Sequence, residues 1–143
     1  MSFNVLIVDD SSSMRGVIKK VIGMSGFRMD NCFEANHGKR AIEVLQQDWV
    51  DVIISDINMP EMNGLEMLKA LNQDSLFKNI PVIIVTTEGS NERMDEAFAL
   101  GAKGFIKKPF LPEDLKKALH NVLGVGDHGE YEEDGTGADG LDF

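Results

Sequence analysis

The sequence has little of what secreted, zinc-binding or membrane-spanning proteins need. Its 143 residues contain a single cysteine, Cys32, which excludes an internal disulfide framework and a zinc site built from several cysteines. The three histidines do not have the spacing of zinc ligands. No uninterrupted apolar run is longer than four residues, too short for a transmembrane helix or a signal peptide. A reducing cytoplasm is therefore the expected compartment, without insertion into a membrane.

Basic residues are also scarce. The chain has 14 Lys and Arg against 24 Asp and Glu, a net charge of −10. Most of this excess lies in residues 124–143, with seven acids and no Lys or Arg, whereas residues 1–123 hold 17 acids and 14 bases. Because binding to nucleic acid needs clustered Lys and Arg, nucleic acid is not an expected partner.

The composition divides the chain at about residue 124. Residues 1–123 have the size of one domain. Residues 124–143 combine six glycines with seven acids, which predicts a flexible, solvated tail. The apolar residues Leu141 and Phe143 leave an alternative open, in which the tail is a docking segment for a partner or for the domain itself.

Two apolar patterns alternate along the domain. Compact apolar runs typical of buried strands alternate with stretches in which apolar residues recur at helical spacing. The predicted strands cover residues 3–8, 27–33, 50–55, 81–86 and 104–107. The predicted helices cover residues 14–22, 39–47, 63–71, 90–100 and 112–123. Ser11 and Ser90 are predicted to cap helices, Gly23 and Gly26 to end the first one, and Trp49 to be a partly buried cap on the core.

Strands that alternate with helices predict an α/β fold. Because the strands are apolar on both faces, we expect a five-stranded parallel sheet with helices on both sides. The flavodoxin-like strand order 2-1-3-4-5 is the common arrangement of such a sheet. Ligands bind in this fold beyond the carboxyl ends of the strands, near the point where the strand order reverses.

Three acidic residues follow the strands that flank this point. Asp9 and Asp10 follow the first strand and Asp56 follows the third. Those strands are neighbours in the predicted order, so the carboxylates should converge, and they repel one another unless a cation is present. Their oxygens suit Mg²⁺, and an aspartate beside such an ion can act as a nucleophile and form an aspartyl phosphate.

The next two strands are also followed by polar residues. The hydroxyl of Thr86 can donate to a phosphoryl oxygen, and the ammonium of Lys108 can pair with one as a point charge. An isolated Asp, Thr or Lys at a strand end is more often a turn residue or a solvated base. Their joint occurrence at successive strand ends favours phosphoryl chemistry.

These residues resemble the motifs of the receiver domain of bacterial two-component response regulators. The motifs are Asp9-Asp10, the run from Asp56 to Gly64, Thr86-Thr87-Glu88 and Lys108-Pro109-Phe110. The resemblance covers residues 3–123. Since no DNA-binding or enzymatic output domain is expected after it, the domain is most similar to the stand-alone receivers of chemotaxis.

The resemblance implies a phosphoacceptor switch that depends on Mg²⁺, not an enzyme that turns over a separate substrate. Asp56 would take a phosphoryl group from the phosphohistidine of a histidine kinase. The Mg²⁺ ligands implied are Asp9, Asp10, Asp56 and the backbone carbonyl of Asn58.

The resemblance also assigns roles around the phosphoryl group. Thr86 and Lys108 would bind its oxygens, Thr87 would narrow the entry, and the Lys108–Pro109 peptide bond would be cis. Asn58 and Glu88 would tune self-dephosphorylation.

A switch of partner binding is implied as well. Phe105 stands at the position of the aromatic residue that responds to phosphorylation. The responding face would be formed by the helix at 90–100, the strand at 104–107 and the helix at 112–123.

Several functions and partners stay open at this point. The flagellar motor switch is the first choice of target, with a phosphatase as a possible second partner. A phosphorelay shuttle or a regulator of another enzyme would have the same motifs. A phosphatase with an aspartate nucleophile would need a second acid where Asn58 stands, and Asp9-Asp10 would repel the phosphate of FMN in a flavodoxin-like carrier.

Overall fold

The computed structural model describes residues 2–124, so the predicted tail beyond Gly124 lies outside the described residues. The strands are β1 (Ser2–Val8), β2 (Arg28–Ala35), β3 (Val52–Ser55), β4 (Val82–Thr86) and β5 (Gly104–Lys107). The helices are α1 (Ser12–Met24), α2 (Gly38–Gln47), α3 (Gly64–Asn72), α4 (Asn91–Ala99) and α5 (Pro112–Leu123). Strands and helices alternate throughout, as the sequence predicts.

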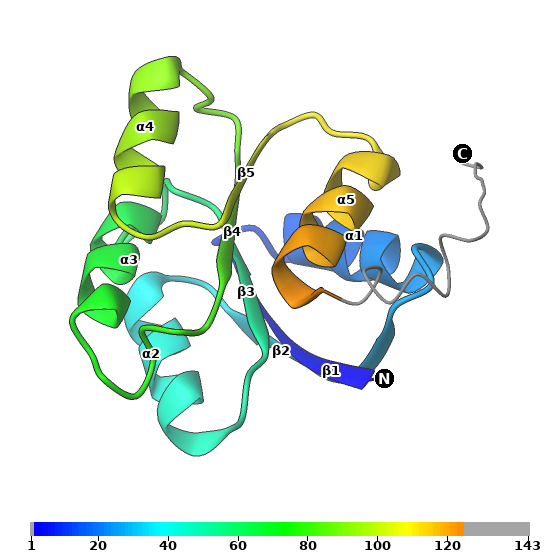
Figure 1. Cartoon of the computed structure of the whole chain (residues 1–143), viewed down its shortest axis with the longest axis horizontal. Coiled ribbons are helices and arrows are strands. Elements are labelled where there is room, and N and C mark those ends of the chain that lie inside the picture. The colour runs from blue at the N-terminus through cyan, green and yellow to red at the C-terminus, as the bar shows by residue number, and fades with distance from the viewer. Residues whose placement is uncertain (1, 125–143) are drawn as a thin grey trace.

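The strands form one parallel sheet in the order β2-β1-β3-β4-β5. Figure 1 shows the sheet between two layers of helices, with α1 and α5 on one side and α2, α3 and α4 on the other. The predicted α/β class, strand order and coverage by helices are therefore confirmed.

Each face of the sheet has its own apolar core, as strand β1 illustrates. Successive side chains of a strand point to opposite faces. Leu6 and Val8 accordingly pack into the core beneath α2, α3 and α4, whereas Val5 and Ile7 pack into the core beneath α1 and α5. All four are at most 2% exposed, which is why this strand is apolar without alternation.

Strand β2 differs from its predicted range because it lies at the edge of the sheet. It pairs with β1 alone, and its register runs on to Ala35 opposite Val8, two residues beyond the predicted end. Much of the strand is exposed, so its sequence lacks the compact apolar run that marks a buried strand. Its end is therefore set by pairing with β1 and not by an apolar pattern.

The start of β3 and the end of α1 also differ from the predictions. Val50 is buried, but β3 begins only at Val52. Gly23 lies inside α1, which continues to Met24, so the prediction that Gly23 ends this helix is wrong. Gly26, with φ of 87°, takes the left-handed conformation that turns the chain toward β2.

The predicted caps are confirmed, whereas the prediction for Trp49 is wrong. Ser11 accepts a hydrogen bond from the backbone of Met14, and Ser90 accepts one from the backbone of Arg93. Trp49 is 77% exposed and its indole nitrogen donates to Asp51, because the loop before β3 turns the ring away from the core.

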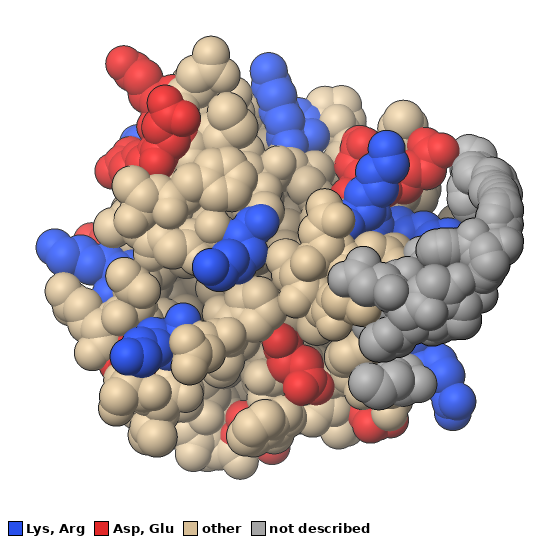
Figure 2. Space-filling model, viewed as in Figure 1, with Lys and Arg blue, Asp and Glu red and all other residues tan. Residues whose placement is uncertain are grey.

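The surface of the described domain carries charges of both signs. Figure 2 shows acidic and basic side chains interspersed with uncharged ones on the face in view. The large negative charge of the chain therefore belongs mainly to the composition of residues 124–143. Among residues 2–124, no helix combines the length and apolar character needed to cross a membrane.

Candidate functional site

The site is built where β1 and β3 end. Val8 pairs with Ser55, and the backbone N–H of Asp56 donates to the carbonyl of Val8 at 2.9 Å. Asp9 and Asp56 therefore leave the sheet side by side. Carboxylate oxygens of Asp9, Asp10 and Asp56 lie within 4.8 Å of one another, so the predicted convergence is present in the structure.

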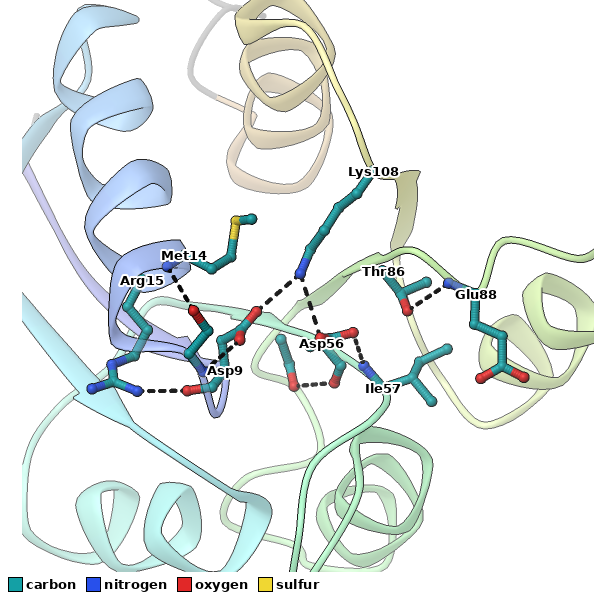
Figure 3. A network of polar contacts seen from close by, with 10 residues as sticks. Asp9, Met14, Arg15, Asp56, Ile57, Thr86, Glu88 and Lys108 are labelled. Carbon is teal, nitrogen blue, oxygen red and sulfur yellow. Dashed lines mark hydrogen bonds and ion pairs between the residues drawn. The ribbon is translucent and has the colours of Figure 1, made fainter.

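Backbone N–H groups fix one oxygen of two of these carboxylates (Figure 3). Asp9 Oδ1 accepts from the backbone of Ser11 at 2.9 Å, and Asp56 Oδ1 accepts from the backbone of Ile57 at 2.7 Å. The side chain of Asp9 is 2% exposed and that of Asp56 is 12% exposed, whereas Asp10 is exposed. Two acids are thus held rigidly, and the third faces solvent.

The ammonium of Lys108 lies between the two buried carboxylates. Its Nζ is 3.1 Å from Asp9 Oδ2 and 3.4 Å from Asp56 Oδ2. The backbone of Lys108 donates to the carbonyl of Thr86, which ties the end of β5 to β4, and the Lys108–Pro109 bond is cis. Figure 3 shows the side chain reaching down to the acids, so this cation balances part of their charge.

Residues after β4 form the rim of the site. Thr86 is buried at the end of β4, and its Oγ1 accepts from the backbone of Glu88 at 3.1 Å. Thr87 is exposed. The carboxylate of Glu88 binds Nε of Arg93 at 2.8 Å, and hydrogen bonds from Arg93 and then Asn58 lower the pKa of Glu88. Asn58 and Glu88 are therefore in contact at this rim.

Phe105 lies apart from the acids, on the side of β5 that faces α4. It is half-buried and packs against the core beneath α2, α3 and α4. Its ring centroid is 6.5 Å from that of Phe98, which is 45% exposed on α4. The sequence analysis did not single out Phe98, because an apolar residue at helical spacing is ordinarily part of a core.

The roles of two further residues at the site were not predicted. A Cβ atom at Gly64 would collide with the backbone oxygen of Asp56, so the start of α3 approaches the site through glycine. The position of this glycine at the end of the 56–64 run was an available signal. Arg15 donates to the backbone oxygen of Asp9, and nothing in the sequence distinguishes it from a solvated helix residue.

The donor set fits a magnesium ion. Mg²⁺ binds oxygen ligands, commonly one or two carboxylates, and keeps several waters. The three carboxylates supply such oxygens, and Asp10 is exposed, so water can reach the cluster. Cys32 takes no part, and burial raises the pKa of its thiol, which disfavours the reactive thiolate.

Comparison with known proteins gives the family. The model of the response regulator receiver domain matches residues 5–120. The chain belongs to this family. It is 44% identical to chemotaxis protein CheY1 of Helicobacter pylori over 124 residues, which cover 86% of this chain and 98% of that protein. It is 43% identical to the CheY homolog of Campylobacter jejuni over 123 residues, which cover 85% of this chain and 93% of that protein.

A solved structure agrees with these relatives. The chemotaxis response regulator CheY4 of Vibrio cholerae superposes with a TM-score of 0.75 at 41% identity, covering 86% of this chain and all of that one. The resemblance to stand-alone chemotaxis receivers is therefore confirmed. The chain is a receiver domain of the CheY type.

Proposed function

We propose that this receiver domain is a Mg²⁺-dependent phosphoacceptor that takes a phosphoryl group on Asp56 from the phosphohistidine of a histidine kinase. One observation supports this most strongly. Asp56 Oδ1 is tied to the backbone of Ile57, while Oδ2 faces Lys108 within the acidic cluster. A fixed carboxylate beside a cation and a metal-type donor set is arranged for nucleophilic attack on phosphorus.

The proposed transfer uses groups already in place. An oxygen of Asp56 forms a bond to phosphorus while the bond from phosphorus to the histidine nitrogen breaks, and that nitrogen keeps the electron pair. The ammonium of Lys108, now shared by two carboxylates, would pair with the phosphoryl oxygens. The hydroxyl of Thr86 would donate to one of them.

The acids would hold the ion needed for this transfer. Asp9, Asp10, Asp56 and the backbone carbonyl of Asn58 are the proposed ligands. A bound Mg²⁺ would neutralise carboxylate charge and stabilise the charge that develops on the phosphoryl oxygens.

Removal of the phosphoryl group is assigned to the rim. The amide of Asn58 would orient the attacking water, and Glu88 would flank it. Thr87, exposed at the entry, would restrict access. A phosphatase partner would act through the same opening.

The proposed output is the face formed by α4, β5 and α5. Phe105 connects the core to this face through its contact with Phe98. A groove of about 420 Å³ beside it is lined by Lys103, Phe105, Lys107, Asp114 and Lys117, among others. A protein target is proposed there, with the flagellar motor switch first because the relatives are named chemotaxis proteins. A cytoplasmic location is part of the proposal.

Phosphorylation by a small donor tests the proposal. With Mg²⁺ and acetyl phosphate, intact mass spectrometry should show one added phosphoryl group, and Asp56→Asn should abolish the gain. Asp48→Asn, at an exposed aspartate between the end of α2 and the start of β3, should behave as wild type. No gain in the wild type, or a gain that survives Asp56→Asn, contradicts the assignment. Turnover of phosphomonoesters would favour the phosphatase alternative.

A further inference from the structure

Arg15 contacts the acidic cluster from the side opposite Lys108. It lies in the first turn of α1, and Figure 3 shows its guanidinium beside the backbone oxygen of Asp9. Nη1 donates to the backbone oxygen of Asp9 at 2.6 Å, and Nε is 2.7 Å from Glu34 Oε1. The side chain is 17% exposed, so the ion pair with Glu34 is partly protected from solvent.

The oxygen that accepts this hydrogen bond belongs to the peptide unit joining Asp9 to Asp10. Its orientation therefore sets the direction in which both carboxylates leave the backbone. The backbone N–H of Asp9 donates to the carbonyl of Ala35 on β2 at 3.0 Å. Glu34, the residue before Ala35 on β2, forms the ion pair that anchors the guanidinium of Arg15. A planar guanidinium can donate hydrogen bonds to the carbonyl and to the carboxylate at once, which a single ammonium does less well.

We infer that Arg15 is a positioning residue for the Mg²⁺ site, which acts by fixing the peptide between Asp9 and Asp10. This inference rests on the proposed function. Hydrogen-bonded groups behind metal ligands commonly change metal affinity by about 10- to 100-fold when they are removed.

The charge of Arg15 and its hydrogen bond to Asp9 have opposite effects on the affinity for Mg²⁺. A cation near the cluster repels Mg²⁺, so a purely electrostatic role predicts tighter binding when Arg15 is removed. A positioning role predicts weaker binding, because the two aspartates lose their fixed direction. The sign of the change in affinity therefore separates the two explanations.

Calorimetric titration of the full chain with MgCl₂ tests the inference. In Arg15→Ala, the dissociation constant for Mg²⁺ should rise by about tenfold. Arg15→Lys keeps the charge but not the two-sided contact, and it should remain several-fold weaker than wild type. Arg40→Ala removes an exposed ion pair with Glu43 on α2, and should bind Mg²⁺ as wild type does.

A melting experiment on the same variants excludes a merely structural role. The melting temperature without Mg²⁺ reports any loss of folding stability, and its rise on adding Mg²⁺ reports the site alone. The inference expects a smaller rise in Arg15→Ala than in wild type at one fixed Mg²⁺ concentration.

Three outcomes would overturn the inference. They are an unchanged or tighter Mg²⁺ affinity in Arg15→Ala, wild-type affinity in Arg15→Lys, and an equal Mg²⁺-induced rise in melting temperature. If the wild type itself does not bind Mg²⁺, the proposed function fails first, and the inference with it. If the wild type binds Mg²⁺ and accepts the phosphoryl group while the variants match it, only the inference fails.

Discussion

Replacing Lys108 by methionine should destabilise the metal-free protein and make it more responsive to Mg²⁺. Methionine is similar in length and keeps the apolar stem but removes the ammonium. Asp9 and Asp56 would then face each other with side chains only 2% and 12% exposed and without the cation that now lies between them. A buried charge that loses its partner is costly because neither water nor protein compensates it.

The expected size follows from the geometry of this triad. At an effective dielectric constant of about 20, a charge pair separated by roughly 3 Å attracts by about 5 kcal/mol. Desolvation of the three groups offsets much of this attraction, and breaking a buried pair is found to cost about 3–5 kcal/mol. Since 1 kcal/mol shifts the melting temperature of a domain this size by about 3–4 °C, the metal-free variant should melt about 10–20 °C lower.

Thermal unfolding in EDTA and in Mg²⁺ measures the effect. The rise in melting temperature on adding Mg²⁺ should be larger in Lys108→Met than in wild type, because the ion replaces the missing cation. Lys107→Met, at an exposed neighbouring position on β5, is the matched control and should melt near wild type. The reasoning is refuted if metal-free Lys108→Met melts within about 2 °C of wild type, a shift below 1 kcal/mol.

Two further predictions concern the loops around the site. Gly64→Ala should lower the free energy of unfolding by about 1–3 kcal/mol, because its Cβ collides with the backbone of Asp56. Gly16→Ala in α1, where nothing lies within 4 Å of the added carbon, should instead be neutral or stabilising by about 1 kcal/mol in urea unfolding. Equal changes in the free energy of unfolding for the two variants would contradict the close contact between Gly64 and Asp56. Arg93→Met should raise the pKa of Glu88 toward its ordinary 4.5 in an NMR titration. Because the pKa of Glu88 is lowered in the folded state, its ion pair with Arg93 stabilises the protein at neutral pH, and this stabilisation is lost as the pH falls through the lowered pKa. An unchanged pKa of Glu88 in Arg93→Met would exclude Arg93 as the main cause of the lowering.

The buried strands were predictable because they are apolar on both faces. The apolar runs that became β1 and β4 are too short to span a membrane, so burial in a sheet was the expected structure. Their alternation with helices then indicated parallel pairing. The edge strand β2 was predicted with the wrong end, because an exposed strand has no apolar run to mark it. Trp49 was misplaced because the path of a loop depends on contacts that local sequence does not specify.

The acids of the site were predictable for a related reason. Once the strand order is known, the residues that follow the parallel strands β1 and β3 must lie at the same end of the sheet. The sequence therefore predicted that Asp9 and Asp56 lie close together. The direction of individual side chains was not predictable. Lys108 was expected beside a phosphoryl group, and the structure shows it between two carboxylates.

The sequence by itself determined the class of this protein. Its periodicity predicted a parallel α/β fold, and the residues at the strand ends predicted an acidic site and resembled the motifs of receiver domains. Only the tertiary structure decided how charge is balanced there. The guanidinium of Arg15 and the ammonium of Lys108 reach the cluster from opposite sides, and long side chains can do so from many positions. Their contacts are set by packing between distant segments. The sequence therefore predicted Lys108 at the site but not its position between two carboxylates, and it did not distinguish Arg15 at all.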